Sequence, residues 1–161
     1  MELSVNGVAR ALECEERTSL ADALREQLGL TGTHLGCEQG SCGACSVLLD
    51  GQPVRSCLLF AVQCDGAAIT TVEGLAPAGE LHPIQRAFHE QHALQCGFCT
   101  PGFLTVLYGA LEDARRASRH LDDNELTTLV GSGLCRCTGY HPILAAARQA
   151  ARELGVYAEG G

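Results

Sequence analysis

Eight of the ten cysteines fall into two sets of four, and their spacing is the most informative feature of the chain. The first set has the spacing C-x4-C-x2-C-x11-C and consists of Cys37, Cys42, Cys45 and Cys57. The second set has the spacing C-x2-C-x35-C-x-C and consists of Cys96, Cys99, Cys135 and Cys137. The first spacing is typical of a plant-type [2Fe–2S] site. Two sets in one chain of 161 residues predict two clusters, and therefore a path for electrons.

The loop that holds the first three cysteines is rich in small residues and reads GCEQGSCGAC over residues 36–45. Small side chains let backbone N–H groups approach inorganic sulfur, and glycine supplies the positive φ where a loop doubles back. We expect Cys57, which follows a predicted hairpin, to bring the fourth thiolate from a strand. Cys42 and Cys45 could alternatively form a redox dithiol, and all four could bind zinc. The lone distant fourth cysteine favours the iron–sulfur interpretation over both.

The second set lies directly before two predicted helices. Cys96 and Cys99 precede a helix that begins at Thr100-Pro101, and the other two cysteines precede a helix that begins at His141-Pro142. Helix N-termini present free N–H groups and a partial positive charge, which favour thiolates and anionic clusters. Two such ends that converge would form a cage for a cluster. From the residues alone, a zinc ion bound by the same four thiolates remains an alternative.

The composition narrows the class of protein. The formal net charge is −8, and this acidic balance argues against nucleic-acid binding, which needs a basic face. No charged and then apolar leader precedes the first predicted strand, and no apolar run is long enough to span a membrane. We therefore expect a cytoplasmic protein whose reduced thiols serve as ligands and not as disulfides.

The sequence of the first half of the chain predicts a small mixed sheet with one helix packed across it. Asn6-Gly7 is a signal for a type I′ turn between strands over 3–5 and 8–14, and Asp50-Gly51 joins strands over 47–49 and 54–59. Ser19 is the predicted N-cap of a helix that ends at Gly29. A last strand is expected over 68–72.

Residues 73–79 have the composition of a linker, and every later segment predicts a helix. Helices are expected over 83–94, 100–118, 122–130 and 141–155, which together predict an antiparallel bundle. The alanine-rich face of the last helix (Ala145 to Ala147, Ala150 and Ala151) is expected to receive a partner surface.

Three motifs in order resemble the iron–sulfur subunit of the molybdenum hydroxylases, the xanthine oxidase family. They are GCEQGSCGACSV, QCGFCTPG and CRCTGY, and the resemblance covers residues 3–154. It implies an α+β fold: a plant-type ferredoxin (β-grasp) domain over 1–75, followed by an all-α four-helix-bundle domain over 76–161. Each domain is implied to hold one [2Fe–2S] cluster. One departure is visible, because Ser132-Gly133-Leu134 stands where the family commonly has Gly-Asn-Leu.

The resemblance also implies a role for this chain. It would pass electrons between a molybdopterin centre and FAD, with no catalytic residue or substrate site of its own. Gln95 matches the glutamine that hydrogen-bonds the pterin, and Cys137 matches the cysteine nearest to it. The implied partners are a molybdopterin-binding large subunit and an FAD-binding medium subunit, in a heterotrimer or a dimer of heterotrimers. The substrate and the direction of electron flow stay open, because the substrate pocket is implied to lie on another chain.

Two other functions remain as alternatives at this point. One is a free-standing ferredoxin with two clusters, and the other is the small subunit of a reductive member such as an aromatic acyl-CoA reductase. Several residues are expected to have structural roles only. Cys14 and Cys64 are predicted core thiols, and His89 and His92 are predicted exposed helix residues. Phe98 and Phe103 are expected to form the dry wall of the second cluster.

Overall fold

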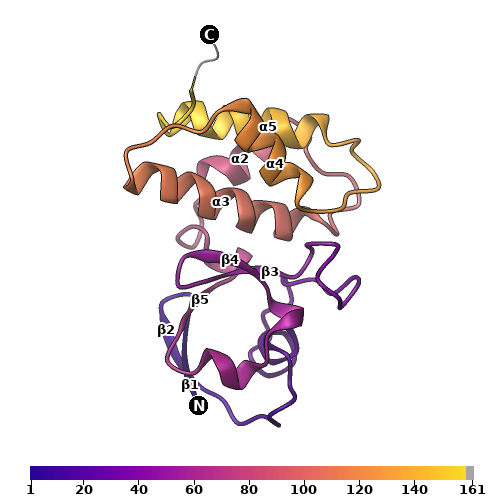
Figure 1. Cartoon of the computed structure of the whole chain (residues 1–161), viewed down its shortest axis with the longest axis vertical. Coiled ribbons are helices and arrows are strands. Elements are labelled where there is room, and N and C mark those ends of the chain that lie inside the picture. Colours follow the sequence, from indigo (N-terminus) through magenta and orange to yellow (C-terminus); the bar gives the residue numbers. More distant parts are fainter. Residues whose placement is uncertain (159–161) are drawn as a thin grey trace.

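Five short strands form a mixed sheet in the order β2-β1-β5-β3-β4. They are β1 (Glu2–Val5), β2 (Val8–Ala11), β3 (Ser46–Leu49), β4 (Gln52–Arg55) and β5 (Ala68–Thr70). The pair β1 and β5 is parallel, and the other neighbours are antiparallel. The computed structural model describes residues 1–158, and the sheet forms the lower half of the molecule in Figure 1.

Both predicted hairpins are present. Asn6 and Gly7 have φ values of 52° and 78°, and Asp50 and Gly51 have values of 49° and 82°, as a type I′ turn requires. The second strand of each hairpin is shorter than predicted. β4 ends at Arg55 because the buried Ser56 turns inward, where its hydroxyl donates to the Cys45 carbonyl at 2.7 Å.

Ser19 caps the helix that crosses the sheet, as the sequence predicts. Its side chain accepts a hydrogen bond from the Asp22 N–H at 3.0 Å. The helix begins as α1 (Leu20–Asp22) and continues as a π-helix over Ala23–Gln27. Leu20 and Leu24 are fully buried against strand residues, which form the first hydrophobic core. The π-helical turn was not predicted, because the apolar spacing fits an α-helix equally well.

The second half contains four helices packed around a separate core (Figure 1). They are α2 (Pro83–Glu90), α3 (Thr100–Arg116), α4 (Asp123–Gly131) and α5 (His141–Glu153). Helices with a mixed sheet confirm the α+β class. The capping box of Asp122 and Glu125 at α4 is present as predicted. Helix α3 begins at Thr100 as predicted, but Thr100 is not the N-cap that the Thr-Pro pattern predicts: it is the first helical residue, and Cys99 is the N-cap.

The alanine-rich face of α5 is not a partner surface. Ala146, Ala147, Ala150 and Ala151 are 0% exposed and belong to the helical core. Small side chains at these positions let the backbones of α2 and α5 come close together, and these two helices pack along each other. Close helix packing therefore compensates for the scarcity of aromatic residues in the sequence.

Helix α3 lies across β3 and β4 and joins the two halves (Figure 1). Two of its glycines make this close approach possible. A Cβ atom on Gly109 would meet Leu48 Cδ2 at 2.8 Å, and one on Gly102 would meet the Gly43 carbonyl oxygen at 2.2 Å. Within residues 1–158, none of the helices combines the length and the apolar character that crossing a membrane requires.

The start of α2 depends on a buried histidine. His82 is the N-cap, and its Nδ1 accepts the Ile84 N–H at 3.3 Å. Its Nε2 lies 3.3 Å from Glu112 Oε1, so the ring proton is on Nε2 and is donated to the carboxylate. The His82 side chain is 11% exposed and packs edge-on against Tyr108. Burial lowers the pKa of His82, against the opposing effect of Glu112.

This arrangement predicts a pH-dependent loss of stability. Because the pKa of His82 is lowered on folding, unfolding takes up a proton once the pH falls below about 6.5. The neutral, capping form therefore contributes stability above that pH and loses it as the pH falls towards the folded pKa. We expect the melting temperature to fall more between pH 7.5 and 5.5 in the natural protein than in His82→Asn, which keeps a capping side chain that does not titrate.

The exposed His89 in the same helix provides the control, because His89→Asn removes a histidine without touching the cap. His82→Ala is expected to cost about 1 kcal/mol of stability at pH 7.5 through loss of the cap. An identical pH dependence in the natural protein and in His82→Asn would show that the pKa of His82 is not lowered on folding.

Candidate iron–sulfur centres

The first four thiols are brought together by the loop over 36–45 and by the turn that follows β4. Cys57 lies on a 3₁₀ turn over Ser56–Leu58, which corrects the expectation that a strand would carry it. The side chain of Cys37 interacts with that of Cys42, and the side chain of Cys57 interacts with that of Cys45. The four predicted ligands therefore lie in two adjacent pairs.

Backbone donors surround the Cys37 sulfur. The N–H groups of Cys42 and Gln39 point at its Sγ from 3.3 and 3.5 Å. Hydrogen bonds from the Ser41 side chain and from these N–H groups lower the pKa of Cys37 to about 6. Burial, together with the neighbouring Cys45, raises the pKa of Cys57 to about 11. Cys37 is thus a thiolate at neutral pH, and Cys57 would lose its proton on binding a metal.

The second four thiols also lie in pairs, in front of α3 and α5. The sulfurs of Cys96 and Cys137 are 3.5 Å apart and exposed, whereas the side chains of Cys99 and Cys135 interact with each other and are half-buried. The Thr138 hydroxyl and N–H lie 3.1 and 3.4 Å from the Cys135 sulfur. Burial raises the pKa of Cys99 to about 12. Two predicted ligands therefore face solvent, and two face the interior.

Pairs of thiols fit a two-iron cluster better than a single metal ion. All ten cysteines are free, and among the described residues no three metal-binding side chains converge on one point. A structural zinc ion needs four ligands around itself. Four thiolates shared by two irons instead place two on each iron, and this is the arrangement that both sets present. The donor chemistry and the pairing fit [2Fe–2S] clusters at both sites.

The two loops touch each other directly. The Leu134 N–H, adjacent to Cys135, donates to the carbonyl of Cys42 at 2.9 Å. Gly43 lies so close that a Cβ atom on it would be 3.1 Å from Gly133 Cα. Cys42 and Cys99 line the same crevice, which has no room for a water molecule. The cysteine spacing does not predict this contact, although the glycines beside the cysteines are a signal for it.

Of the two predicted wall residues, one is placed as expected. Phe103 is 4% exposed and packs in the helical core near the second set. Phe98 is 49% exposed and reaches the first loop, where its ring stacks on His34 at a centroid distance of 4.9 Å. The His34 Nδ1–H donates to the Phe98 carbonyl at 2.8 Å. Phe98 therefore joins the two loops instead of forming the wall of one.

The remaining cysteines and histidines lie outside both sets. Cys64 is 2% exposed in the sheet core, and Cys14 is half-buried beside Met1, with 3.7 Å between their sulfurs. His89 and His92 are exposed, as predicted. His92 follows the end of α2 and has a φ of 50°, so the two do not share a helix face.

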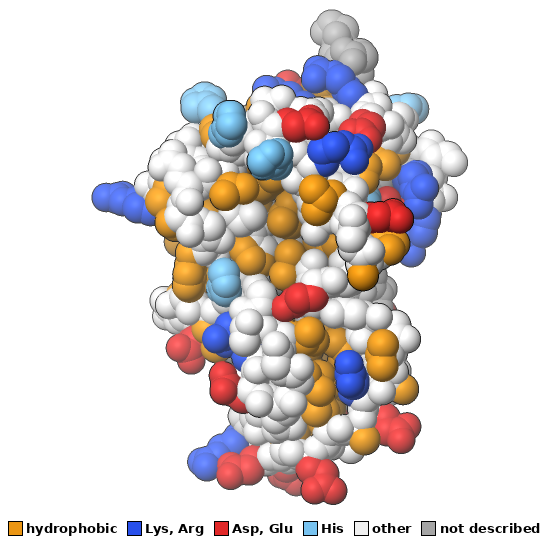
Figure 2. All heavy atoms as spheres, turned by 180° about the vertical axis from the view of Figure 1, so that it is seen from behind, with side chains coloured by type: hydrophobic (Ala, Val, Ile, Leu, Met, Phe, Trp, Pro, Cys, Tyr) orange, Lys and Arg blue, Asp and Glu red, His pale blue; other side chains and the backbone are white. Residues whose placement is uncertain are grey.

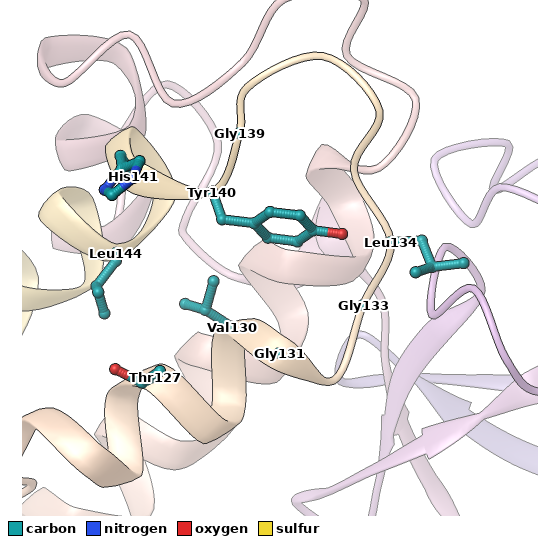
Figure 3. A pocket seen from close by; sticks show the side chains of 9 residues that line it. All are labelled: Thr127, Val130, Gly131, Gly133, Leu134, Gly139, Tyr140, His141 and Leu144. Atoms are coloured by element: carbon teal, nitrogen blue, oxygen red, sulfur yellow. The ribbon is translucent and has the colours of Figure 1, made fainter.

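The surface around the second set is open and partly apolar. Gln95 is exposed beside Cys96, as the predicted contact with a pterin would require. The loop over 131–140, which carries Cys135 and Cys137, borders a mainly apolar cavity of about 390 Å³ (Figure 3). The Tyr140 ring crosses this region towards the segment of Leu134, and its hydroxyl accepts the Cys135 N–H at 3.0 Å.

Comparisons with known proteins agree with this arrangement. Residues 3–70 match the 2Fe-2S iron-sulfur cluster binding domain, and residues 71–148 match the [2Fe-2S] binding domain. The chain is 53% identical to the gamma subunit of caffeine dehydrogenase from Pseudomonas sp. (strain CBB1), over 89% of this chain and 86% of that protein. It is 46% identical to the nicotine 6-hydroxylase small subunit of Paenarthrobacter nicotinovorans, over 96% and 91%.

Solved structures show the same fold. Quinoline 2-oxidoreductase from Pseudomonas putida 86 superposes with a TM-score of 0.88 at 44% identity, covering 96% of this chain and 94% of that chain. The aldehyde oxidoreductase from Desulfovibrio gigas gives the same TM-score at 40% identity, but only 17% of that chain is covered. These matches confirm two [2Fe–2S] domains in one chain, as the cysteine spacing predicts.

The ligand sets make a prediction about iron content. The natural protein is expected to hold about four iron and four acid-labile sulfide per chain. Cys42→Ser and Cys99→Ser are each expected to lose one cluster, and therefore about half of the iron. Cys64→Ala is the matched control: it removes a buried thiol from outside both sets, so it should keep both clusters at a cost of about 1–2 kcal/mol in stability. Loss of an electron paramagnetic resonance (EPR) signal in Cys64→Ala would show that the sets are wrong.

Proposed function

This chain belongs to the iron–sulfur small subunits of the molybdenum hydroxylase family, and we propose that it carries electrons between a molybdopterin subunit and an FAD subunit. The observation that carries the proposal is the contact between the two thiol-lined loops. The hydrogen bond from the Leu134 N–H to the Cys42 carbonyl links a residue adjacent to one predicted ligand with a predicted ligand of the other set. A crevice without room for water keeps this contact dry.

The proposed ligands follow the observed pairs. Cys37 with Cys42, and Cys45 with Cys57, would hold the two irons of the first site. In the second site the pairs are Cys96 with Cys137 and Cys99 with Cys135. When bound, the clusters supply one-electron transfer at both sites. The chain itself contributes N–H donors to the sulfurs, buries part of each site and fixes the separation of the two loops.

The proposed domains are those of the family. The first covers residues 1–75, and the second, a four-helix bundle, covers 76–161. Two separate hydrophobic cores support a division into two domains, with the boundary a few residues earlier, because Leu75 packs in the helical core. Helix α3 packs on β3 and β4, and this contact supports a fixed arrangement of the two domains. The distance between the two clusters would depend on that arrangement.

Exposed apolar side chains support the proposal that this chain has obligate partner subunits. Four large hydrophobic residues beside predicted ligands are 42–60% exposed: Leu58, Leu94, Phe98 and Leu134. Figure 2 shows hydrophobic side chains gathered around the junction of the two halves. A free carrier would keep such surface covered, whereas a subunit buries it against its neighbours. These observations favour a subunit over the free-standing ferredoxin.

We place the molybdopterin-binding large subunit against the second site, where Gln95 and Cys137 are exposed. The FAD-binding medium subunit would then face the first site, near Leu58. A heterotrimer, or a dimer of heterotrimers, is the assembly proposed. The names of the relatives support a division of labour, because they include caffeine, nicotine and aldehyde as substrates. Similar small subunits thus serve different oxidations, so the choice of substrate is assigned to another chain.

A substitution at Gln95 tests the proposed orientation. If its amide donates to or accepts from the pterin, Gln95→Ala removes about 0.5–1.5 kcal/mol, which corresponds to up to about a tenfold loss of pterin retention or of the rate of cluster reduction. Iron content is expected to stay unchanged, since the side chain is not a predicted ligand. The measurement is pterin content and substrate-driven reduction of the clusters in the purified complex.

Gln27→Ala, on an exposed position of the sheet half, serves as the control. If Gln95→Ala keeps both normal turnover and normal pterin content, the large subunit does not contact the chain at this position.

A further inference from the structure

One arginine connects the two thiol-lined loops. Arg55 is the last residue of β4, and its guanidinium donates through Nη1 to the Ser46 hydroxyl and through Nη2 to the Ser132 carbonyl. The Ser46 hydroxyl in turn donates to the Gly43 carbonyl at 2.6 Å. Ser46 directly follows Cys45, and Ser132 begins the segment that leads to Cys135. A single side chain therefore bridges both candidate centres.

The guanidinium lies in the crevice between the two sets of thiols. It lines this crevice together with Cys42 and Cys99, and a Cβ atom on Gly43 would be 3.2 Å from Arg55 Cζ. The crevice has no room for a water molecule. Within residues 1–158, seven other arginines form ion pairs with carboxylates, and Arg55 forms none. Its positive charge is therefore not neutralised by a carboxylate of the described chain.

An uncompensated charge at this place acts on electron transfer. A site with four thiolates is negatively charged, and it gains one more negative charge on reduction. A guanidinium is charged at every pH in the working range, and on the side that lines the crevice, where there is no room for water, its field is screened less than in bulk solvent. It therefore stabilises the reduced form more than the oxidised form. The effect is largest at the first site, because Arg55 lies two residues from Cys57 and contacts Ser46.

We propose that Arg55 is a positioning residue with two effects: it clamps the two loops together and raises the reduction potential of the first cluster. The inference rests on the proposed cluster ligands. Holding the two loops together needs the planar guanidinium group, because it donates to Ser46 and Ser132 at the same time. Raising the reduction potential of the first cluster needs only the positive charge. Lysine and glutamine at this position therefore separate the two effects.

The test is a redox titration of the loaded protein, followed by EPR spectroscopy. Arg55→Gln is expected to lower the equilibrium constant for reduction of the first cluster at least tenfold, a shift of about 59 mV to more negative potential for a one-electron couple. Arg55→Lys keeps the charge, so its equilibrium constant is expected to stay within about threefold of the natural value. Both variants lose the planar guanidinium group, so both are expected to weaken the magnetic interaction between the reduced clusters.

The control is Arg10→Gln, which removes the same charge from an exposed position of β2 and is expected to leave both potentials unchanged. Unchanged potentials in Arg55→Gln at full iron content would overturn the proposal. If Arg55→Gln does not load iron, Arg55→Lys decides: a potential near the natural value supports the charge effect, and a tenfold fall overturns it. Failure of the proposed function itself would be distinguishable, because the natural protein would then lack two EPR signals.

Discussion

The direct backbone contact between two cysteine-bearing loops is the constraint on which the rest of this structure depends. Electron transfer by tunnelling weakens steeply with distance, so two redox centres in one path must lie close together. Here Gly43 of the sheet half lies against Gly102 of α3 and against Gly133, with no side chain between them. Glycine inside a helix costs about 1 kcal/mol relative to alanine. At Gly102 this cost is offset by the close approach that no other residue permits.

The fold serves this contact from both sides. The sheet and its crossing helix form one core that supports the loop over 36–45, and α2 to α5 form another that supports the second loop. Buried alanines bring α2 and α5 together, so the helical half reaches a packed core with few aromatic residues. Thiolates at one place repel each other, and the chain opposes this repulsion with N–H donors at Cys37, helix starts behind Cys99 and Cys137, and the guanidinium of Arg55.

Much of this arrangement could be predicted from local sequence signals. The turns at Asn6-Gly7 and Asp50-Gly51, the caps at Ser19 and Asp122, and the two cysteine sets each depend on neighbours in the chain. The errors concern contacts between distant segments. Phe98 joins the two loops because His34, 64 residues away, offers its ring and its N–H. The alanines of α5 are covered by α2, and Cys57 lies on a 3₁₀ turn because β4 ends where the buried Ser56 bonds to Cys45. No local pattern encodes these pairings.

The magnetic interaction between the two reduced clusters tests the central contact most directly. Each reduced [2Fe–2S] cluster carries an unpaired spin, so two clusters held by touching loops are expected to split each other's EPR signals. Gly102→Ala places a methyl group 2.2 Å from the Gly43 carbonyl oxygen, so the loops must separate. Gly131→Ala has open space around its new methyl group and serves as the matched helix control. We predict that the splitting weakens in Gly102→Ala, at unchanged iron content, and persists in Gly131→Ala. A splitting in Gly102→Ala equal to that of the natural protein would contradict the contact between the loops as the determinant of the electron path.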